Sequence, residues 1–318
     1  MIGAMRSGAE MQARDVDAGQ PTTADRPWRP WVIAALLLGA VASVVIELAP
    51  DSYQIFGPYP VIDAHLLLSA LEAFLPFAFA AAVVYGADGW PTGQSRLWWG
   101  AGMLAFAAVL RLVAELVFAG ITFDTITAFE GLNTWMPIRY VTELAVTSAG
   151  VGLLATGLWR GRGSFGSDAK PNGGRMAVAV VGIVAALAVI ADLWAAGLMV
   201  DGFPVDLVAF GVAGGLLTAA TSIALGALAV VALRITPASA RQPELLIASG
   251  ATLVLVGRAA QWALPYALQS GTQFNPLSGA IFTVVAVVTS FGLIAMSLGF
   301  VLSGLAAHPP RPVPEVVA

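Results

Sequence analysis

Charged residues are scarce in this chain: Asp, Glu, Lys and Arg together make up 11% of its 318 residues, about half the share found in an ordinary soluble domain. Hydrophobic residues make up 58%, and the mean hydropathy is +0.83. A soluble protein of this composition would expose large apolar patches and aggregate. The composition therefore excludes a soluble enzyme, a disordered chain and a nucleic-acid-binding protein. It predicts an integral membrane protein with several spans.

Cysteine is absent and histidine is nearly so. The absence of cysteine excludes disulfides, thiolate metal sites and a cysteine nucleophile. Two histidines, His65 and His308, are too few for the paired ligands of a transmembrane haem, and we expect neither a metal nor a cofactor. No P-loop, HExxH pair or GxSxG turn is present, so an enzyme is the less favoured class. One lysine against fourteen arginines, with many Ala and Gly, indicates a prokaryotic source.

Eight apolar runs each reach the ~20 residues that a helix needs to cross the hydrocarbon of a bilayer. Spans of a β-barrel would be about 10 residues long and would alternate polar with apolar residues, which these runs do not. The sequence therefore predicts an all-α integral membrane protein of eight transmembrane helices. The expected spans are Trp31–Ala49, Asp63–Tyr85, Leu97–Gly120, Ile138–Trp159, Met176–Val200, Val205–Leu233, Leu245–Leu268 and Leu277–Leu305.

Basic residues predict the orientation, because Lys and Arg collect on the cytoplasmic side of membrane proteins. With the N-terminus inside, twelve of the fifteen basic residues fall in cytoplasmic segments. They are Arg6, Arg14, Arg26, Arg29, Arg96, Arg160, Arg162, Lys170, Arg175, Arg234, Arg241 and Arg311. We therefore predict a multi-pass protein of the cytoplasmic membrane with both termini in the cytoplasm.

The two halves of the chain resemble each other, which predicts a tandem duplication of four helices. Asn133, Val146, Thr147, Ser148, Gly150 and Gly157 recur 142 positions later as Asn275, Val288, Thr289, Ser290, Gly292 and Gly299. With small gaps, Arg111 aligns with Arg258. Because four is even, both repeats would have the same orientation, related by an axis along the membrane normal. The expected organisation is a disordered cytoplasmic tail (1–30), a first repeat (31–160), a cytoplasmic linker (161–175), a second repeat (176–306) and a disordered cytoplasmic tail (307–318).

Ten ionisable residues lie within or beside the expected spans, where a charge costs roughly 2.5–3.5 kcal/mol at the bilayer centre. Counting 1.5 Å per residue along each helix places all of them between the midplane and the outer surface. This predicts a polar pocket that opens outward above a closed apolar half, with most of its residues from the first repeat. Arg258 has no acid within one turn and needs a partner on another helix, such as Asp192 or Glu72. The candidate ligand-binding residues are Glu47, Asp63, His65, Glu72, Arg111, Glu115, Arg139, Glu143, Asp192 and Arg258.

Three functions fit this pattern. The first is a carrier or permease for a small polar or charged solute, because parallel repeats occur in carriers with a site between the halves. The second is a non-transporting sensor or assembly scaffold, which would need a protein partner that the sequence does not identify. The third is a membrane-embedded enzyme acting on a lipid or isoprenoid, with the carboxyls doing acid–base work. In each case the bilayer is the surrounding partner, and nucleic acid is not.

Overall fold

The computed structural model describes residues 26–48, 62–90, 92–120, 126–161, 174–198, 205–235, 242–268 and 276–307. Within these ranges the structure is helical and contains no strand. Eight helices are long and apolar enough to cross a membrane, which confirms the predicted number and makes the chain a multi-pass membrane protein. They are α2 (Arg29–Glu47), α3 (Ile62–Gly86), α4 (Gln94–Gly120), α5 (Ile126–Gly161), α6 (Gly174–Leu198), α7 (Val205–Ile235), α8 (Gln242–Leu268) and α9 (Pro276–Ala307), with a short 3₁₀ turn, η3, at Ala87–Gly89.

Helix α5 begins earlier than the sequence indicates, at Ile126 instead of Ile138. The apolar run that predicts this span begins at Ile138. The helix nevertheless continues through Pro137, although a proline inside a helix removes one backbone hydrogen bond and crowds the preceding turn. At 1.5 Å per residue its 36 residues span about 54 Å. That exceeds the ~30 Å hydrocarbon core, so α5 extends beyond the membrane.

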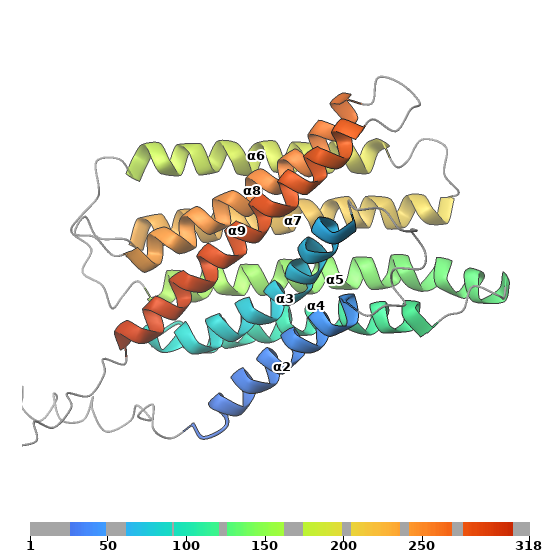
Figure 1. Ribbon diagram of the computed structural model, residues 1–318. Helices are drawn as coiled ribbons and strands as arrows, with labels where there is room; N and C mark the ends of the chain where they lie inside the picture. The colour runs from blue at the N-terminus through green and yellow to red at the C-terminus, as the bar shows by residue number, and fades with distance from the viewer. Residues whose placement is uncertain are drawn as a thin grey trace, which may run out of the picture.

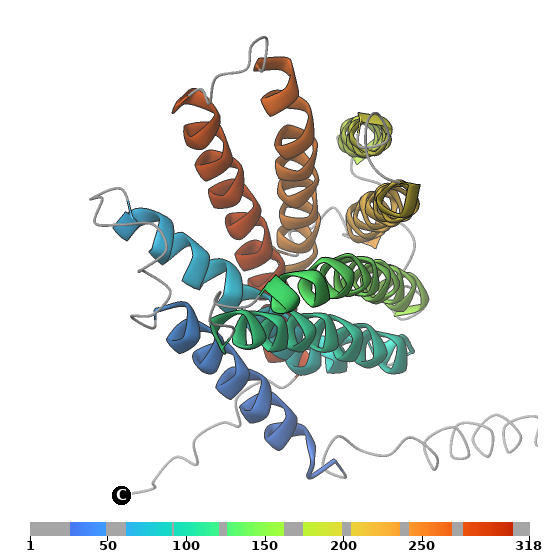
Figure 2. The same cartoon turned by 90° about the vertical axis from the view of Figure 1, so that its right-hand side faces the viewer.

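Six of the helices form a closed ring, in the order α3, α4, α5, α7, α8 and α9, with α9 packed back against α3. Helix α2 packs outside this ring against α3, and α6 packs outside it against α7 and α8. The two outer helices therefore lie at opposite edges of the bundle, as Figures 1 and 2 show from perpendicular directions. In this order the helices of the first half meet those of the second at two places, α3 with α9 and α5 with α7.

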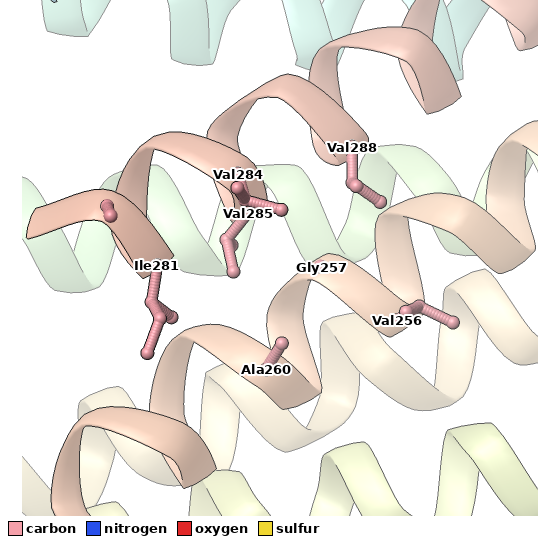
Figure 3. Close-up of a pocket in the computed structure, with 8 residues that line it drawn as sticks. Val256, Gly257, Ala260, Ile281, Val284, Val285 and Val288 are labelled. Carbon is pink, nitrogen blue, oxygen red and sulfur yellow. The ribbon is translucent and has the colours of Figure 1, made fainter. Parts of the chain in front are cut away.

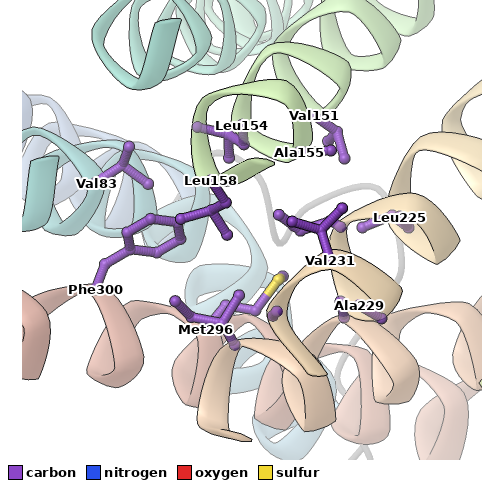
Figure 4. Packing of buried hydrophobic residues seen from close by; sticks show 14 of the residues in the cluster. Val83, Val151, Leu154, Ala155, Leu158, Leu225, Ala229, Val231, Met296 and Phe300 are labelled. Carbon is purple, nitrogen blue, oxygen red and sulfur yellow. The ribbon is translucent and has the colours of Figure 1, made fainter. Parts of the chain in front are cut away.

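The centre of the ring is filled by aliphatic and aromatic side chains from all six helices. Leu158 of α5 and Phe300 of α9 are almost fully buried and point toward each other (Figure 4). Phe300 also makes edge-to-face contacts with Phe79 and Trp90, at ring-centroid distances of 5.9 Å and 5.6 Å. The ring is thus a packed core and not an open pore through its length.

Large apolar side chains cover the outside of the bundle. Leu38 of α2 is 70% exposed, Ile190 of α6 62% and Phe291 of α9 61%. In water this much exposed apolar surface would drive aggregation, but in a bilayer these faces lie against acyl chains. The two outer helices therefore need only one buried stripe each, which explains why so little of α2 is buried.

One end of the bundle, which we call the Arg29 end, carries a polar cluster. It is the end at which α2 and α4 begin and α3 and α9 finish. Arg29 makes an ion pair with Asp88 of η3 and donates to the carbonyl of Tyr85, and the Gln94 amide donates to Asp88. Together these bonds tie α2 to the connection between α3 and α4.

Two residues that precede the expected first span contact α4: Arg26 stacks 4.1 Å from the Trp98 ring centroid, and Trp28 packs edge-on against the same ring. Residues 1–25, 162–173 and 308–318, which hold most of the predicted tails and linker, lie outside the described residues.

Candidate functional site

A cavity of about 270 Å³, walled mostly by glycine and alanine, lies between α5, α6 and α7, toward the end of the bundle opposite the Arg29 end. Helix α5 contributes one lining residue, whereas α6 and α7 contribute the others. The lining residues are Tyr140, Asp192, Ala195, Ala196, Gly211, Gly214, Gly215 and Thr218. Most of them belong to the second half of the chain, which differs from the expected dominance of the first half.

Glycines of α7 shape the walls of this cavity. A Cβ placed on Gly215 would lie 2.2 Å from the Cβ of Ala196, and one on Gly214 would lie 3.1 Å from the ring of Tyr140. A side chain at Gly215 would force α6 and α7 apart, whereas one at Gly214 would require a small shift of the Tyr140 ring. The Gly211-x-x-x-Gly215 spacing is typical of close helix packing in membranes, and here it also places Tyr140 and Asp192 on one cavity.

Asp192 is the acidic residue of the cavity and is only 2% exposed. The Ser222 hydroxyl of α7 donates to its Oδ2 at 2.8 Å. Its other oxygen, Oδ1, is buried and has no hydrogen-bond partner among the described residues. A buried carboxylate oxygen without a partner costs free energy, which a hydrogen-bond donor that reached Oδ1 would recover.

The carboxyl group of Asp192 interacts electrostatically with the positive charge of Arg258 on α8. Asp192 lines the cavity, whereas Arg258 itself does not. Within the described part of the chain, its buried Nε has no hydrogen-bond acceptor. The structure therefore brings Arg258 to Asp192, one of the two acids that the sequence named as its partner.

Arg139 and Glu143 form a second polar pair beside the cavity, on α5. The Arg139 guanidinium lies 3.3 Å from Glu143 Oε2, and the two side chains are 25% and 27% exposed. They are one helical turn apart, as the sequence indicated, and both flank Tyr140 in sequence without lining the cavity. Partial exposure weakens such a pair, so it contributes less to the site than Asp192 does.

Of the predicted site residues whose side chains the structure describes, Asp192 alone lines this cavity. Glu72 is half-buried on α3, which forms a different part of the ring. Glu47 and Arg111 are half-buried and interact with other groups. The side chains of Asp63, His65 and Glu115 lie outside the described residues. The described candidates thus separate into the Asp192–Arg258 group, the Arg139–Glu143 pair, and residues of α2, α3 and α4.

Sequence reasoning missed three polar groups that the fold positions. Tyr140 reads as an aromatic residue at the membrane interface, and Ser222 reads as a hydroxyl bonded to its own helix, which it also is, through the Thr218 carbonyl at 3.1 Å. Glu244, 5% exposed at the start of α8, lies just before the expected span. Only the neighbouring helices distinguish these residues from interfacial ones.

Two other hollows have no charged residue in their walls. A cavity of about 320 Å³ between α8 and α9 is lined entirely by Gly, Ala, Val and Ile, with Gly257 facing Val284 and Val285 (Figure 3). A groove of about 800 Å³ between the first turns of α6 and α8 is lined mainly by aliphatic residues. Neither offers a charged group, whereas the cavity at Asp192 does.

Among the described residues, no three His, Asp or Glu side chains lie close enough together to hold a metal ion. Comparison of the chain with protein-family models, with curated proteins and with solved structures finds no match.

Proposed function

We propose that this protein is a membrane carrier that binds a small polar or charged solute in the cavity between α5, α6 and α7. The observation that carries the proposal is the buried Asp192 carboxyl, whose Oδ1 has no partner among the described residues. Ionisable groups inside a membrane are costly and usually mark substrate or ion pathways. Residues from both halves line the cavity, as in carriers whose site lies between two repeats.

The order of helices in the ring supports a duplicated, two-unit architecture. The second helix of the first unit, α3, packs against the fourth of the second unit, α9. The reciprocal contact joins α5 and α7. This exchange is expected when two four-helix units in the same orientation are related by a two-fold axis along the membrane normal. The outer helices α2 and α6 occupy equivalent places as the first helix of each unit.

Glycine contacts support the same architecture at residue level. A Cβ on Gly150 would lie 3.2 Å from the carbonyl oxygen of Gly100, and one on Gly292 would lie 2.7 Å from that of Gly250. Gly150 and Gly292 are a predicted equivalent pair, so Gly100 corresponds to Gly250, 150 positions later. With this offset of 150 positions, Arg111 aligns with Gln261. Arg258 then has no arginine at the equivalent position of the first unit, whereas the sequence alignment paired it with Arg111.

The proposal includes the orientation. With both termini in the cytoplasm, the Arg29 end is the inner end, and the cavity lies in the outer half of a prokaryotic cytoplasmic membrane. The charge bias supports this assignment. Close packing at the Arg29 end supports a closed inner side, because a Cβ on Gly86 would lie 2.2 Å from the carbonyl oxygen of Phe300.

Uptake into proteoliposomes by purified protein tests the proposal, with a panel of amino acids, sugars, organic anions and organic cations. We expect uptake of at least one solute, and its loss in Asp192→Asn. Glu244→Gln is the matched control, since it also removes a buried carboxylate charge, but at the far end of α8. Binding without uptake would instead favour the sensor, and absence of both would refute a solute-binding role.

A further inference from the structure

The groove between α6 and α8 lies on the outer surface of the bundle at the Arg29 end, where both helices begin (Figure 1). Its volume is about 800 Å³, larger than either of the other two hollows described above. Its walls include large side chains that face away from the core: Met176 is 76% exposed, and Val180 and Leu245 are each 47% exposed. In a membrane protein, lipid acyl chains and not water surround such side chains.

The length of the groove matches one leaflet of a bilayer. The groove follows α8 from Gln242 to Leu253 and α6 from Met176 to Val181. At 1.5 Å per residue, its α8 side extends about 16 Å, which is about half of the ~30 Å hydrocarbon core. The groove therefore begins near the membrane surface and ends near the midplane, as an acyl chain of a single leaflet does.

Two arginines stand at the surface end of this groove. Arg175 directly precedes Met176 at the start of α6, and Arg234 directly follows Leu233 near the end of α7. Neither arginine lines the groove, but each is the neighbour in sequence of a residue that does. Both side chains are exposed, and neither forms an ion pair within the described part of the chain. Long arginine side chains at helix ends extend to the membrane surface, where their charges attract anionic headgroups.

No acidic side chain offsets these charges in the walls of the groove. Glu244, in the first turn of α8, is 5% exposed, interacts with another group and does not line the groove. Gln242 lines the surface end and is exposed, so its amide is a further hydrogen-bond donor there. The groove thus combines two positive charges and a neutral donor at the surface with apolar walls below them.

We propose that this groove binds an anionic phospholipid of the leaflet at the Arg29 end. The headgroup phosphate binds Arg175 and Arg234, and one acyl chain lies along α6 and α8. Arginine suits this contact, because its guanidinium forms paired hydrogen bonds to phosphate. In the proposed orientation this is the cytoplasmic leaflet, whose surface is negatively charged. The groove and the Asp192 cavity share no lining residue, so the lipid site does not depend on the proposed carrier function.

Native mass spectrometry of the detergent-solubilised full chain tests this proposal, with dioleoylphosphatidylglycerol and dioleoylphosphatidylcholine as matched probes. The two lipids have the same acyl chains and differ in the net charge of the headgroup. We expect the phosphatidylglycerol to bind with a Kd at least about tenfold lower, because two arginines near the surface attract its charge. The comparison between lipids uses the unmodified protein, so it does not depend on whether a variant folds.

Charge substitutions test the assigned headgroup contacts. The double variant Arg175→Gln, Arg234→Gln should abolish the preference for phosphatidylglycerol. The double variant Arg96→Gln, Arg160→Gln is the matched control, because it also removes two positive charges at the Arg29 end, from α4 and α5, and neither residue lines the groove. This control should retain the preference.

A bulky side chain tests the groove itself. Ser249 lines the groove and is exposed, so Ser249→Trp places an indole ring in the path of the acyl chain and should weaken the binding of both lipids. Thr156→Trp is the control, because Thr156 is an exposed hydroxyl residue on α5 that does not line the groove. It should leave both Kd values unchanged.

Each contrary result overturns a different statement. Equal Kd values for the two lipids in the unmodified protein would refute the headgroup assignment. Equal loss of preference in the two double variants would refute the site, since general charge at this end would then account for binding. Unchanged lipid binding in Ser249→Trp would refute the groove as the acyl-chain site. Dimers that form with rising protein concentration and are lost in Ser249→Trp would assign the groove to a second copy of the chain.

Discussion

The hydrogen bond between Ser222 and Asp192 joins α7 to α6 at the cavity. Its length is 2.8 Å, and both residues are buried. Ser222 is fully buried, so its removal leaves Asp192 Oδ2 without the protein donor that the structure describes for it. The hydroxyl thus compensates part of the cost of keeping a carboxyl group inside the membrane.

Removal of this hydroxyl in Ser222→Ala should therefore destabilise the protein. Hydrogen bonds to charged groups contribute about 1.5–3 kcal/mol in soluble proteins, whereas interhelical bonds in membranes contribute less, up to about 1.7 kcal/mol. We expect a loss of about 1–2 kcal/mol in the free energy of unfolding, measured by denaturant titration in mixed micelles.

Ser249→Ala is the control for this experiment, because that serine is exposed and bonds only to the carbonyl of Leu246 on its own helix. It should change stability by less than about 0.5 kcal/mol. Equal losses in the two variants would mean that the Ser222 bond to Asp192 adds nothing beyond a local helix bond.

At this scale, sequence reasoning located charges but not their surroundings. Asp192 and Arg258 stand out because charges inside spans are rare, and Arg258 needs an acid from another helix. The contributions of Ser222 and Tyr140 depend on which helices are neighbours, and eight similar apolar helices carry little information about that. The position of a charge along its helix was therefore predictable, whereas the set of groups that surrounds it was not.

Close glycine contacts between consecutive helices organise the elements. Glycine faces glycine between α4 and α5, at Gly100 and Gly150, and between α8 and α9, at Gly250 and Gly292. Without a hydrophobic force between helices in lipid, van der Waals packing at small residues drives their association. We therefore expect these contacts to hold each of the two helix pairs rigidly.

A methyl group at Gly292 should force α8 and α9 apart. In Gly292→Ala the new Cβ would meet the carbonyl oxygen of Gly250 at 2.7 Å and Val254 Cγ2 at 2.8 Å, and a backbone atom cannot move aside alone. Overpacking of this kind costs about 1–3 kcal/mol, which a lowered thermal unfolding midpoint would report.

Gly182→Ala is the matched control on α6, because nothing lies within 4 Å of its added Cβ. There the change should be neutral or stabilising by about 0.5–1 kcal/mol, since alanine forms helices better than glycine. An unchanged midpoint in Gly292→Ala would show that the helices separate without strain, and the proposed rigid pairing would be wrong.

At the element scale, apolar run length was enough to predict all eight helices. It failed at the start of α5, because polar residues and Pro137 resemble a loop although the helix continues through them. Apolar run length could not predict which helices are neighbours. Under the proposed duplication, the register of α4 against α8 is taken from the glycine contacts, whereas the sequence alone aligns Arg111 with Arg258.

For the whole molecule, the asymmetry between its two ends is the property on which the proposed function depends. The Arg29 end is closed by the Arg29–Asp88 ion pair and by close backbone contacts between α3 and α9. The opposite end holds the cavity. Whether that cavity faces the outside or the cytoplasm follows from the orientation, which the basic residues predict.

The chain's lack of cysteine makes this orientation directly testable, because a single introduced cysteine is a unique reporter. Asp168→Cys places it between α5 and α6, on the predicted inner side, and Asp201→Cys places it between α6 and α7, on the predicted outer side. A membrane-impermeant maleimide added to intact cells should label Asp201→Cys and leave Asp168→Cys unlabelled. After permeabilisation both should react, which controls for accessibility of each thiol. The reverse pattern would place the Arg29 end outside and the Asp192 cavity on the cytoplasmic side. The same site would then load its solute from within the cell, and the proposed carrier would run as an exporter.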